Sequence, residues 1–450
     1  MRFRFFFLFL FLLSSPSYAQ EYRFRGTMSQ QVLNNYLDRA ITMQGQSEVE
    51  GNGQLSEAER RRNIAMLHNV GAKFVSRIGG WWENAYDQTA HDALFAAVRQ
   101  NVRDLHARDR EVICQAAVFE YVSESVNNIT VPARVLRAFG LPVVQRNFRY
   151  QDMLYPAPAA QYRVYDGPMP ESMRHFTPDI TTQEAQLWFY YMATRYLDAG
   201  CEAIHFGQVE VMNRRDMGNA QWWALLQKIR AYAATHNRGV VLCDGHVPSG
   251  GIYYEPMLAH TMALAEWQAY RPASDSTKQL VLDFHSLGVY YQEAPSCTPE
   301  RQPVTLPLNP TAGLHQSSLG GNSPRGWTAV RNPYLVELDN GGPNTEAAVG
   351  CDYDRSRDWF LWGWDEISWF AQQPPPYRDS VLVYSYYRIK ELDPQGHLAM
   401  PGMRGVEPGM GRAGYLYRSN TGLGNQQTTM KNIWQGMYAD SARQAEQFLR

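Results

Sequence analysis

The chain has little of three things that would narrow its class at once: cysteine, excess charge of one sign, and long apolar runs beyond its first residues. Its 450 residues include 5 cysteines, too few for a scaffold built on disulfides. The 42 basic and 44 acidic side chains leave a net charge of −2, which excludes binding of nucleic acid by a broad basic surface. No stretch after the N-terminal segment has the length of a membrane span. A large globular core is therefore expected.

Several well-known motifs are also missing. The sequence contains no P-loop, no H-E-x-x-H and no G-x-S-x-G. No CxxC and no Cys/His cluster indicates structural zinc. The sequence therefore gives no indication of an organic cofactor. Aromatic residues are plentiful at 13%, which suits a sugar-stacking site and a large core equally well.

The first residues have the pattern of a secretory signal peptide. Arg2 and Arg4 precede an unbroken apolar run over residues 5–13, and Ser17-Tyr18-Ala19 supplies small residues for cleavage before Gln20. The segment 1–19 is too short to span a bilayer. The sequence thus predicts a secreted or periplasmic protein without a membrane span.

The remainder, 20–450, is expected to form one α/β domain, because short β-type runs alternate with long helical ones. This alternation favours a (β/α)8 TIM barrel with long loops on its C-terminal face. A doubly wound open sheet is the alternative, but residues 78–82 lack the G-x-G-x-x-G spacing that it needs. Long insertions are expected near 123–180 and 286–332. Eight strands are predicted, at 73–82, 111–122, 203–212, 239–247, 280–287, 334–340, 359–369 and 397–404.

The helices are predicted at 29–41, 56–70, 90–108, 182–199, 222–235, 377–392 and 425–449. One ambiguity affects the numbering of the strands. If residues 143–149 form a strand, Ala203–Met212 becomes the fourth strand and Tyr334–Asn340 the seventh. Residues 397–404 would then lie outside the barrel.

Polar side chains recur where the predicted strands end. Side chains at positions i and i+2 of a strand share a side, so each polar-x-polar pair points the same way. Buried carboxylates are costly unless paired or hydrated, which makes five such ends more typical of a site than of chance. The five ends are Gln208-Val209-Glu210, Asp244-Gly245-His246, Asp283-Phe284-His285, Glu337-Leu338-Asp339 and Trp364-Asp365-Glu366.

Clustered carboxylates beside aromatic residues suit glycoside hydrolysis, in which one carboxyl protonates the leaving oxygen and another attacks or activates water. Glu210 is the candidate acid, since it follows an apolar strand where desolvation would raise its pKa. Glu337 is the candidate nucleophile and Glu366 its rival, while Asp339 could orient either. Gln208 could bond to Glu210 or to a substrate hydroxyl.

Other side chains are candidates for substrate binding. Trp81 and Trp364 could stack on sugar rings, although such residues also pack barrels and helices. Arg77 could lower the pKa of a carboxylate nucleophile or bind an acidic sugar, and a structural ion pair is equally open. Asp244, His246, Asp283 and His285 complete the proposed set at the barrel mouth.

With Glu210 and Glu337 at strand ends, the chain resembles the retaining TIM-barrel glycoside hydrolases. That resemblance implies an acid/base after the fourth strand and a nucleophile on the seventh. Glu210 and Glu337 take these positions only in the strand count in which residues 143–149 form a strand. The chain departs in one respect, because Gln208-Val209-Glu210 stands where such enzymes usually carry Asn directly before Glu. The stretches 203–210, 242–251, 334–340 and 362–367 are also similar to uncharacterised secreted bacterial proteins.

Two other interpretations stay open. The pairs Asp244/His246 and Asp283/His285, with Glu210, could bind a divalent cation in a sugar isomerase or hydrolase, although H-x-H is absent. A non-catalytic carbohydrate-binding barrel is the other alternative. In every case a carbohydrate is the expected ligand.

Overall fold

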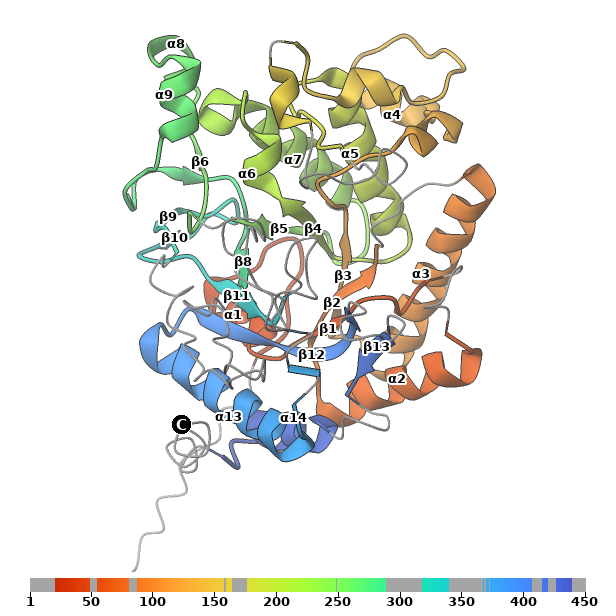
Figure 1. The fold of residues 1–450 in the computed structure, drawn as a ribbon, viewed down its shortest axis with the longest axis vertical. Helices are drawn as coiled ribbons and strands as arrows, with labels where there is room; N and C mark the ends of the chain where they lie inside the picture. Colours follow the sequence, from red (N-terminus) through yellow and green to blue (C-terminus); the bar gives the residue numbers. More distant parts are fainter. Residues whose placement is uncertain are drawn as a thin grey trace, which may run out of the picture.

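The computed structural model describes residues 21–48, 55–80, 87–157, 159–163, 176–247, 249–288, 318–339, 367, 370–371, 373–406, 415–419 and 426–438. Within these ranges a closed barrel of parallel strands forms the centre of the molecule (Figure 1). Its order is β1-β2-β3-β4-β5-β8-β11-β12, closed by pairing of β1 with β12. The strands are β1 Ala40–Met43, β2 Phe74–Gly79, β3 Ile113–Ala117, β4 Ala203–Gln208, β5 Leu242–His246, β8 His285–Gly288, β11 Tyr334–Glu337 and β12 Gly396–Val406. The predicted (β/α)8 class is confirmed.

Helices surround these strands, with α13 and α14 at the bottom of the view and α5 and α7 at the top (Figure 1). The main helices are α1 Gln30–Leu37, α2 Glu57–Val70, α3 Gln88–Arg108, α5 Gln183–Asp198, α7 Ala220–Ala233, α13 Pro375–Leu392 and α14 Gln426–Trp434. Their starts follow local capping chemistry. Ser56 and Glu59 form a reciprocal capping box at α2, and the side chain of Thr182 accepts from the backbone of Ala185 at α5. Gly71 ends α2 in the left-handed conformation.

The first barrel strand lies where the sequence predicts the end of a helix. The helix predicted over 29–41 ends at Leu37 as α1, and Ala40–Met43 then forms β1. This part of the prediction is wrong because four residues are too few for a period of two to stand out against a helical pattern.

The extra strand changes the numbering of the barrel. Residues 143–149 contain no strand, and only an isolated bridge joins Thr130 to Asn147. Gly396–Val406 belongs to the barrel, and its C-terminal part pairs with β13 Tyr415–Arg418 as a hairpin. Most of the strand predicted at 359–369 lies outside the described residues, but Ile367 is helical. Ala203–Gln208 is therefore the fourth barrel strand and Tyr334–Glu337 the seventh.

The insertions carry short elements. Between β3 and α5 lie η1 Glu124–Asn128, α4 Ala133–Ala138, η2 Tyr150–Met153 and η3 Ala159–Tyr162. After β4 come α6 Val209–Met212 and η5 Met217–Asn219, and after β5 come α8 Leu258–Thr261 and α9 Leu264–Ala269. A second small sheet, in the order β10-β9-β7-β6, joins Thr328–Ala329, Gly321–Asn322, Gln279–Leu280 and Tyr253–Tyr254.

An apolar layer fills the N-terminal end of the barrel. Each barrel strand, or the residue beside it, contributes one buried side chain to this layer: Ala40, Phe74, Ile113, Ala203, Leu242, Phe284, Leu335 and Ala399. Residues 22–37, which include α1, pack against the layer in the same cluster. The hydroxyl oxygen of Tyr36 lies 2.5 Å from the backbone oxygen of Tyr22 and 2.7 Å from that of Glu111. Residues 22–37 therefore close this end of the barrel.

The side chains at the alternate positions of these strands face outward, toward the helices. Val75, Cys114, Ile204, Cys243 and Val336 belong to the large cluster that also holds the apolar sides of α2, α3, α5, α7 and α13. Burial on both sides explains why these parallel strands are almost continuously apolar at their N-terminal ends.

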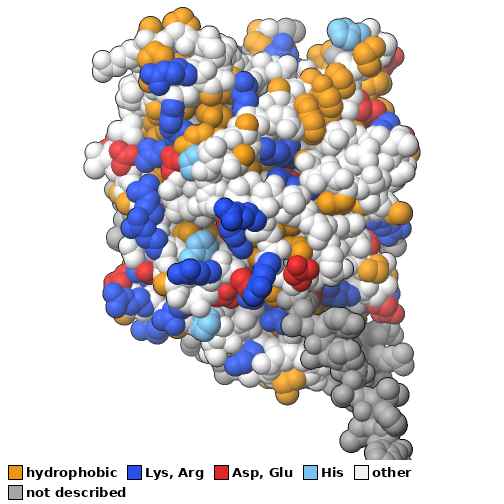
Figure 2. All heavy atoms as spheres, turned by 180° about the vertical axis from the view of Figure 1, so that it is seen from behind, with side chains coloured by type: hydrophobic (Ala, Val, Ile, Leu, Met, Phe, Trp, Pro, Cys, Tyr) orange, Lys and Arg blue, Asp and Glu red, His pale blue; other side chains and the backbone are white. Residues whose placement is uncertain are grey.

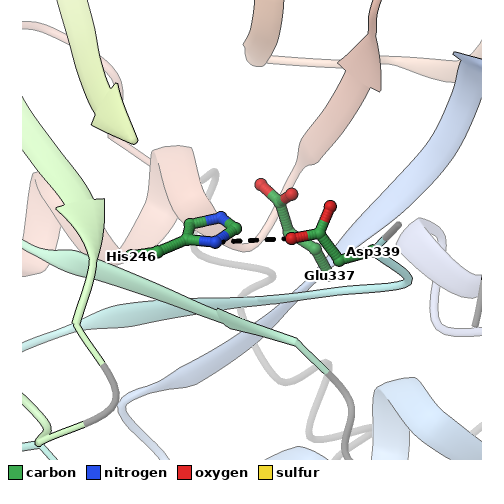
Figure 3. A group of neighbouring side chains, drawn as sticks. All are labelled: His246, Glu337 and Asp339. Atoms are coloured by element: carbon green, nitrogen blue, oxygen red, sulfur yellow. Dashed lines mark ion pairs between the residues drawn. The ribbon is translucent and has the colours of Figure 1, made fainter. Parts of the chain in front are cut away.

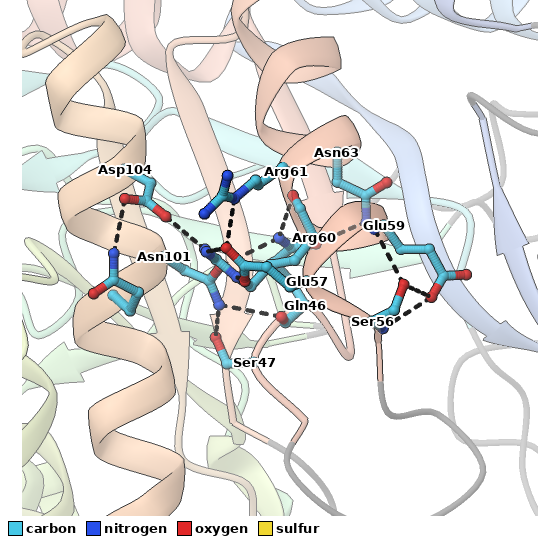
Figure 4. A network of polar contacts seen from close by, with 11 residues as sticks. Gln46, Ser47, Ser56, Glu57, Glu59, Arg60, Arg61, Asn63, Asn101 and Asp104 are labelled. Atoms are coloured by element: carbon cyan, nitrogen blue, oxygen red, sulfur yellow. Dashed lines mark hydrogen bonds and ion pairs between the residues drawn. The ribbon is translucent and has the colours of Figure 1, made fainter.

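Beside the apolar core, ion pairs and hydrogen bonds link α2, α3 and the loop after β1. Arg60 joins Glu57 on α2 to Asp104 on α3, while Asn101 donates to Ser47 in the loop after β1 (Figure 4).

Figure 2 shows side chains of both charge signs close together on the face seen from behind. Among the described residues, no helix has the length and apolar character that a membrane crossing requires.

Candidate functional site

Above the apolar layer, the interior of the barrel becomes polar. Asp244 on β5 lies there fully buried and receives three hydrogen-bonding side chains from other strands. Gln115 on β3 donates to Asp244 Oδ1 at 2.7 Å, and Ser286 on β8 donates to Oδ2 at 2.9 Å. His205 Nδ1 on β4 lies 2.8 Å from the same Oδ2. Contacts from three strands place these side chains inside the barrel.

Nearer the C-terminal end, five buried side chains form an arginine–carboxylate group: Arg77, His246, Glu337, Asp339 and Arg404. Arg77 Nη2 lies 2.8 Å from Glu337 Oε2, and its Nη1 lies 3.4 Å from Asp339 Oδ1. Arg404 Nη2 binds Asp339 Oδ1 at 2.6 Å, and its Nη1 lies 3.4 Å from Glu337 Oε2. Two guanidinium groups therefore balance two carboxylates, as buried charges require.

His246 completes this group. Its Nε2 lies 2.9 Å from Arg77 Nη2, and its Nδ1 lies 3.3 Å from Asp339 Oδ2 (Figure 3). Because a guanidinium only donates, Nε2 accepts and Nδ1 carries the proton that points to Asp339. Burial lowers the pKa of His246 to about 3, which agrees with a neutral ring.

The carboxyl groups of the interior respond differently to burial. Desolvation opposes ionisation of Asp339, but the positive charges of Arg77 and Arg404, together with the polar Nδ1–H of His246, outweigh it and lower the pKa of Asp339. At Asp244, desolvation dominates over the bonds from Ser286 and Gln115 and raises the pKa to about 8. Such divergent environments are typical of functional sites, and structural ion-pair networks produce them as well.

A backbone irregularity brings Arg77 into the group. Phe74 and Ser76 face the barrel interior, so regular alternation would turn Arg77 outward. Arg77 instead has φ of 55°, and the register with β3 shifts between Val75 and Gly79. A non-glycine residue in the left-handed region is strained and needs support, which the two ion pairs of Arg77 supply.

A second irregularity lies at the end of β4. Gly207 has φ of 58°, and the register with β5 shifts between His205 and Gln208. The carboxylate of Glu120 lies directly over Gly207, and its Oε2 accepts the backbone N–H of Gln208 at 3.0 Å. Bulges of this kind occur at barrel rims beside sites.

Glu210 lies after β4, on the short helix α6 rather than on the strand as predicted. It is half-buried, and desolvation raises its pKa against the opposing effects of Ser249, Arg271 and Arg214. Gln208 is buried, and its side-chain oxygen has no hydrogen-bond partner. Glu210 and Gln208 both remain near the C-terminal end of the fourth strand.

Asp283 and His285 do not join the site, which corrects the prediction for this pair. The strand β8 begins at His285, and Phe284 and Ser286 face the interior, so Asp283 and His285 face outward. Asp283 is paired with Arg230 and Arg325, and His285 stacks on Tyr334. The pattern D-x-H is the same as in Asp244/His246, but the parity is opposite.

Three predicted residues, Trp81, Trp364 and Glu366, lie outside the described residues, as does the proposed signal peptide 1–19. In contrast, His205, Gln115 and Glu120 are buried at the site and were not singled out in the sequence. Arg404 ends the strand predicted at 397–404 and was not named as a site residue either. The sequence did contain a signal for His205. It lies two positions after Ala203 on β4, so a strand that turns Ala203 inward also turns His205 inward.

His246, Glu337 and Asp339 each offer a ligand atom within 4.8 Å of the others, a spacing that suits a metal ion. The residues around them do not fit a divalent cation. Arg77 and Arg404 already bind the oxygens that would be ligands, and their positive charges would repel the ion. The group is therefore built as an ion-pair network.

No family model and no curated protein sequence matches the chain. Among solved structures, a protein of Salmonella typhimurium provisionally assigned as an α-amylase aligns over 83% of this chain and 56% of its own, at 10% identity and a TM-score of 0.40. A trehalulose synthase variant aligns over 82% and 65%, at 11% identity and 0.34. The α-galactosidase of Thermus thermophilus aligns over 48% and 42%, at 10% identity and 0.29.

The chain thus spans less than two thirds of the length of each of these three structures. The pairing of its own strands, rather than this likeness, defines the chain as a (β/α)8 barrel.

Proposed function

We propose that the chain hydrolyses a glycosidic bond, with Glu210 as proton donor and Glu337 as nucleophile or general base. One observation carries the proposal: Glu210 lies on the short helix that follows the fourth barrel strand, and Glu337 ends the seventh strand. These are the positions that the resemblance to retaining TIM-barrel glycoside hydrolases implies. The C-terminal ends of barrel strands are also where such folds carry catalytic residues.

The environments of the two carboxyl groups support different roles. Desolvation raises the pKa of Glu210, which favours the protonated form that a general acid needs. The negative charge of Glu337 is balanced by Arg77 and Arg404, which both contact its Oε2. Pairs of carboxyls with opposed environments divide the acid and nucleophile roles in glycosidases.

In the proposed reaction, Glu210 transfers its proton to the glycosidic oxygen as the bond from that oxygen to the anomeric carbon breaks. Glu337 either bonds to the anomeric carbon, and water then breaks this bond while Glu210 takes the proton of the water, or it removes a proton from water that attacks the anomeric carbon directly. A carboxyl separation of about 5–5.5 Å indicates retention, and about 6.5–9.5 Å indicates inversion. Asp339, fixed by Arg404 and His246, would hold the arginines in place. Glu366 remains the alternative nucleophile.

A non-catalytic carbohydrate-binding barrel is the second candidate. It is favoured by the burial of both Glu337 and Asp339 in ion pairs with two arginines, an arrangement that also stabilises a barrel without chemistry.

Substitution of each carboxyl distinguishes the two candidates. The purified protein is first assayed on a panel of aryl glycosides and polysaccharides. Glu210→Gln and Glu337→Gln should each lower kcat by about 100-fold or more, with sugar affinity retained. Glu391→Gln, on an exposed ion pair with Arg388, is the control that should leave kcat unchanged. If both variants turn over substrate at the wild-type rate, the proposal is contradicted. If the wild-type protein binds sugar but shows no turnover, the second candidate is supported.

We also propose export of the protein, on the basis of the basic, apolar and small-residue pattern of residues 1–19. Expression of the full chain in a Gram-negative host, followed by N-terminal sequencing of the extracytoplasmic protein, should give Gln20 as the first residue. Retention of an intact N-terminus in the cytoplasm contradicts this.

A further inference from the structure

His205 lies inside the barrel with only one of its two ring nitrogens in use. Nδ1 lies 2.8 Å from Asp244 Oδ2, but Nε2 is buried and has no hydrogen-bond partner. The side chain is 2% exposed. A buried nitrogen without a partner costs free energy, so native sites of this kind are usually completed by a water or a ligand.

The orientation of His205 is fixed by its neighbour Asp244. Asp244 is held by Gln115 and Ser286, so the carboxyl that meets His205 Nδ1 has little freedom. A carboxyl that is hydrogen-bonded to one ring nitrogen fixes the orientation of the ring, and with it the direction of the other nitrogen. Asp244 thus acts through His205, and we class it as a positioning residue.

The ring of His205 also lies against the arginine–carboxylate group. It meets the ring of His246 edge-to-face, with centroids 4.8 Å apart, and meets the ring of Phe119 edge-to-face with centroids 6.3 Å apart. The charges of Arg77 and Glu337 act on it electrostatically. The free nitrogen therefore belongs to the same interior region as Glu337, on the fourth strand that also leads to Glu210.

We propose that the Asp244–His205 pair is a hydroxyl-binding subsite, in which Nε2 of His205 binds a hydroxyl of a sugar held at the barrel mouth. The inference rests on the proposed function for the identity of the ligand. A hydroxyl group both donates and accepts, so it fits either tautomer of the neutral ring. Burial lowers the pKa of His205 to about 3, so the ring is neutral at ordinary pH.

His285 provides a matched control. It is also buried, burial lowers its pKa to about 3, and both of its ring nitrogens lack partners. It faces outward and stacks on Tyr334 at 5.2 Å. A general effect of losing a buried imidazole will therefore appear at both positions, whereas loss of a subsite will appear only at His205.

The test uses two isosteric changes. His205→Asn keeps a polar atom near Nδ1 but ends before Nε2, whereas His205→Gln places an amide nitrogen near Nε2. Binding of glucose, galactose, mannose and xylose to the full chain is measured by calorimetry, with near-UV circular dichroism to confirm the fold. For a sugar that the wild type binds, His205→Asn should weaken affinity at least about tenfold. His205→Gln should restore most of it, and His285→Asn should have no effect.

A second measurement does not depend on the variants. Monodeoxy analogues of the bound sugar are titrated into the wild type, and removal of one hydroxyl should reproduce the loss seen with His205→Asn. Unchanged affinity in folded His205→Asn, equal losses at His205 and His285, or equal binding of all deoxy analogues would overturn the subsite while leaving the hydrolysis assay to stand. No binding of any of the four sugars would also overturn it. Binding that depends on His205 without turnover would retain the subsite and defeat the hydrolysis proposal.

Discussion

At the scale of single residues, the interior of the barrel is governed by compensation of charge. Glu337 and Asp339 are buried, and each is in contact with both Arg77 and Arg404. Removal of one partner from such a network leaves a buried charge without compensation, which is far more costly than the loss of a surface pair.

Replacement of Arg404 by Met should therefore lower the free energy of unfolding by about 3–5 kcal/mol. Urea denaturation measures this change. Arg61 is 72% exposed and paired with Glu57, so Arg61→Met should change stability by less than about 0.5 kcal/mol. A loss below about 1 kcal/mol at Arg404 would show that the network contributes little to the fold.

Buried neutral histidines should make stability depend on pH. Burial lowers the pKa of His285 to about 3, whereas an unfolded histidine has a pKa near 6.5. Between these values the unfolded chain binds the additional proton, so this contribution to stability is complete above about pH 6.5 and is lost as the pH falls.

The wild type should lose about 1.4 kcal/mol per pH unit more than His285→Gln between about pH 6 and 4. The comparison is made between two proteins because Asp244, whose pKa is raised to about 8, contributes with the opposite sign in both. Urea denaturation at pH 7.5, 6, 5 and 4.5 measures the two slopes. Parallel curves over this range would mean that His285 is protonated in the folded state.

At the scale of elements, two bulges aim the side chains of the site. Arg77 in β2 and Gly207 in β4 have positive φ, and both lie where the register with the next strand shifts. Simple alternation locates inward residues up to the bulge and fails beyond it. For this reason the sequence pattern identified Asp244, His246, Glu337 and Asp339 as neighbours but missed how Arg77 reaches them.

Gly207→Ala should destabilise the protein more than a glycine substitution in open space. A methyl group at Gly207 would lie 1.8 Å from Glu120 Oε2, in addition to the penalty of φ at +58°. Gly140 has φ of +67° with nothing within 4 Å, so Gly140→Ala reports the backbone penalty alone, about 1 kcal/mol. Thermal and urea unfolding should separate the two variants by at least about 1 kcal/mol. Equal losses would mean that Glu120 moves freely from Gly207.

At the scale of the whole molecule, residues 22–37, the N-terminal segment of the described chain, share one core with the barrel. Tyr36 is completely buried against the apolar layer at the N-terminal end of the barrel. It contacts Tyr22, Glu111 and Arg238, which are distant from one another in sequence. A barrel has no sheet edge once β1 pairs with β12, so its strands are expected to unfold together.

Tyr36→Ala should lower the free energy of unfolding by about 3–5 kcal/mol for the entire barrel. Near-UV and far-UV circular dichroism should then show the same shifted midpoint in urea. Tyr36→Phe, which keeps the ring and loses the hydroxyl, should lose only about 1–3 kcal/mol. Separate midpoints for the two probes would indicate that the N-terminal segment detaches on its own.

The amino-acid sequence alone determined the class of the fold and most of its helices. Alternating apolar runs and helical periods are local signals, and they survive without knowledge of contacts. The sequence also placed Glu337 and Asp339 at a strand end, because that pattern is short-range. It did not separate Asp244/His246 from Asp283/His285, which have the same spacing.

Only the tertiary structure decided which parity faces inward, where the first strand lies, and which charges meet. Asp283 and Asp244 differ in role because closure of the barrel turns one to Arg230 outside and the other to His205 inside. Ala40–Met43 became a strand because it pairs with both neighbours, β2 and β12. These outcomes depend on contacts between residues far apart in the chain, and such contacts leave no local trace in a single sequence.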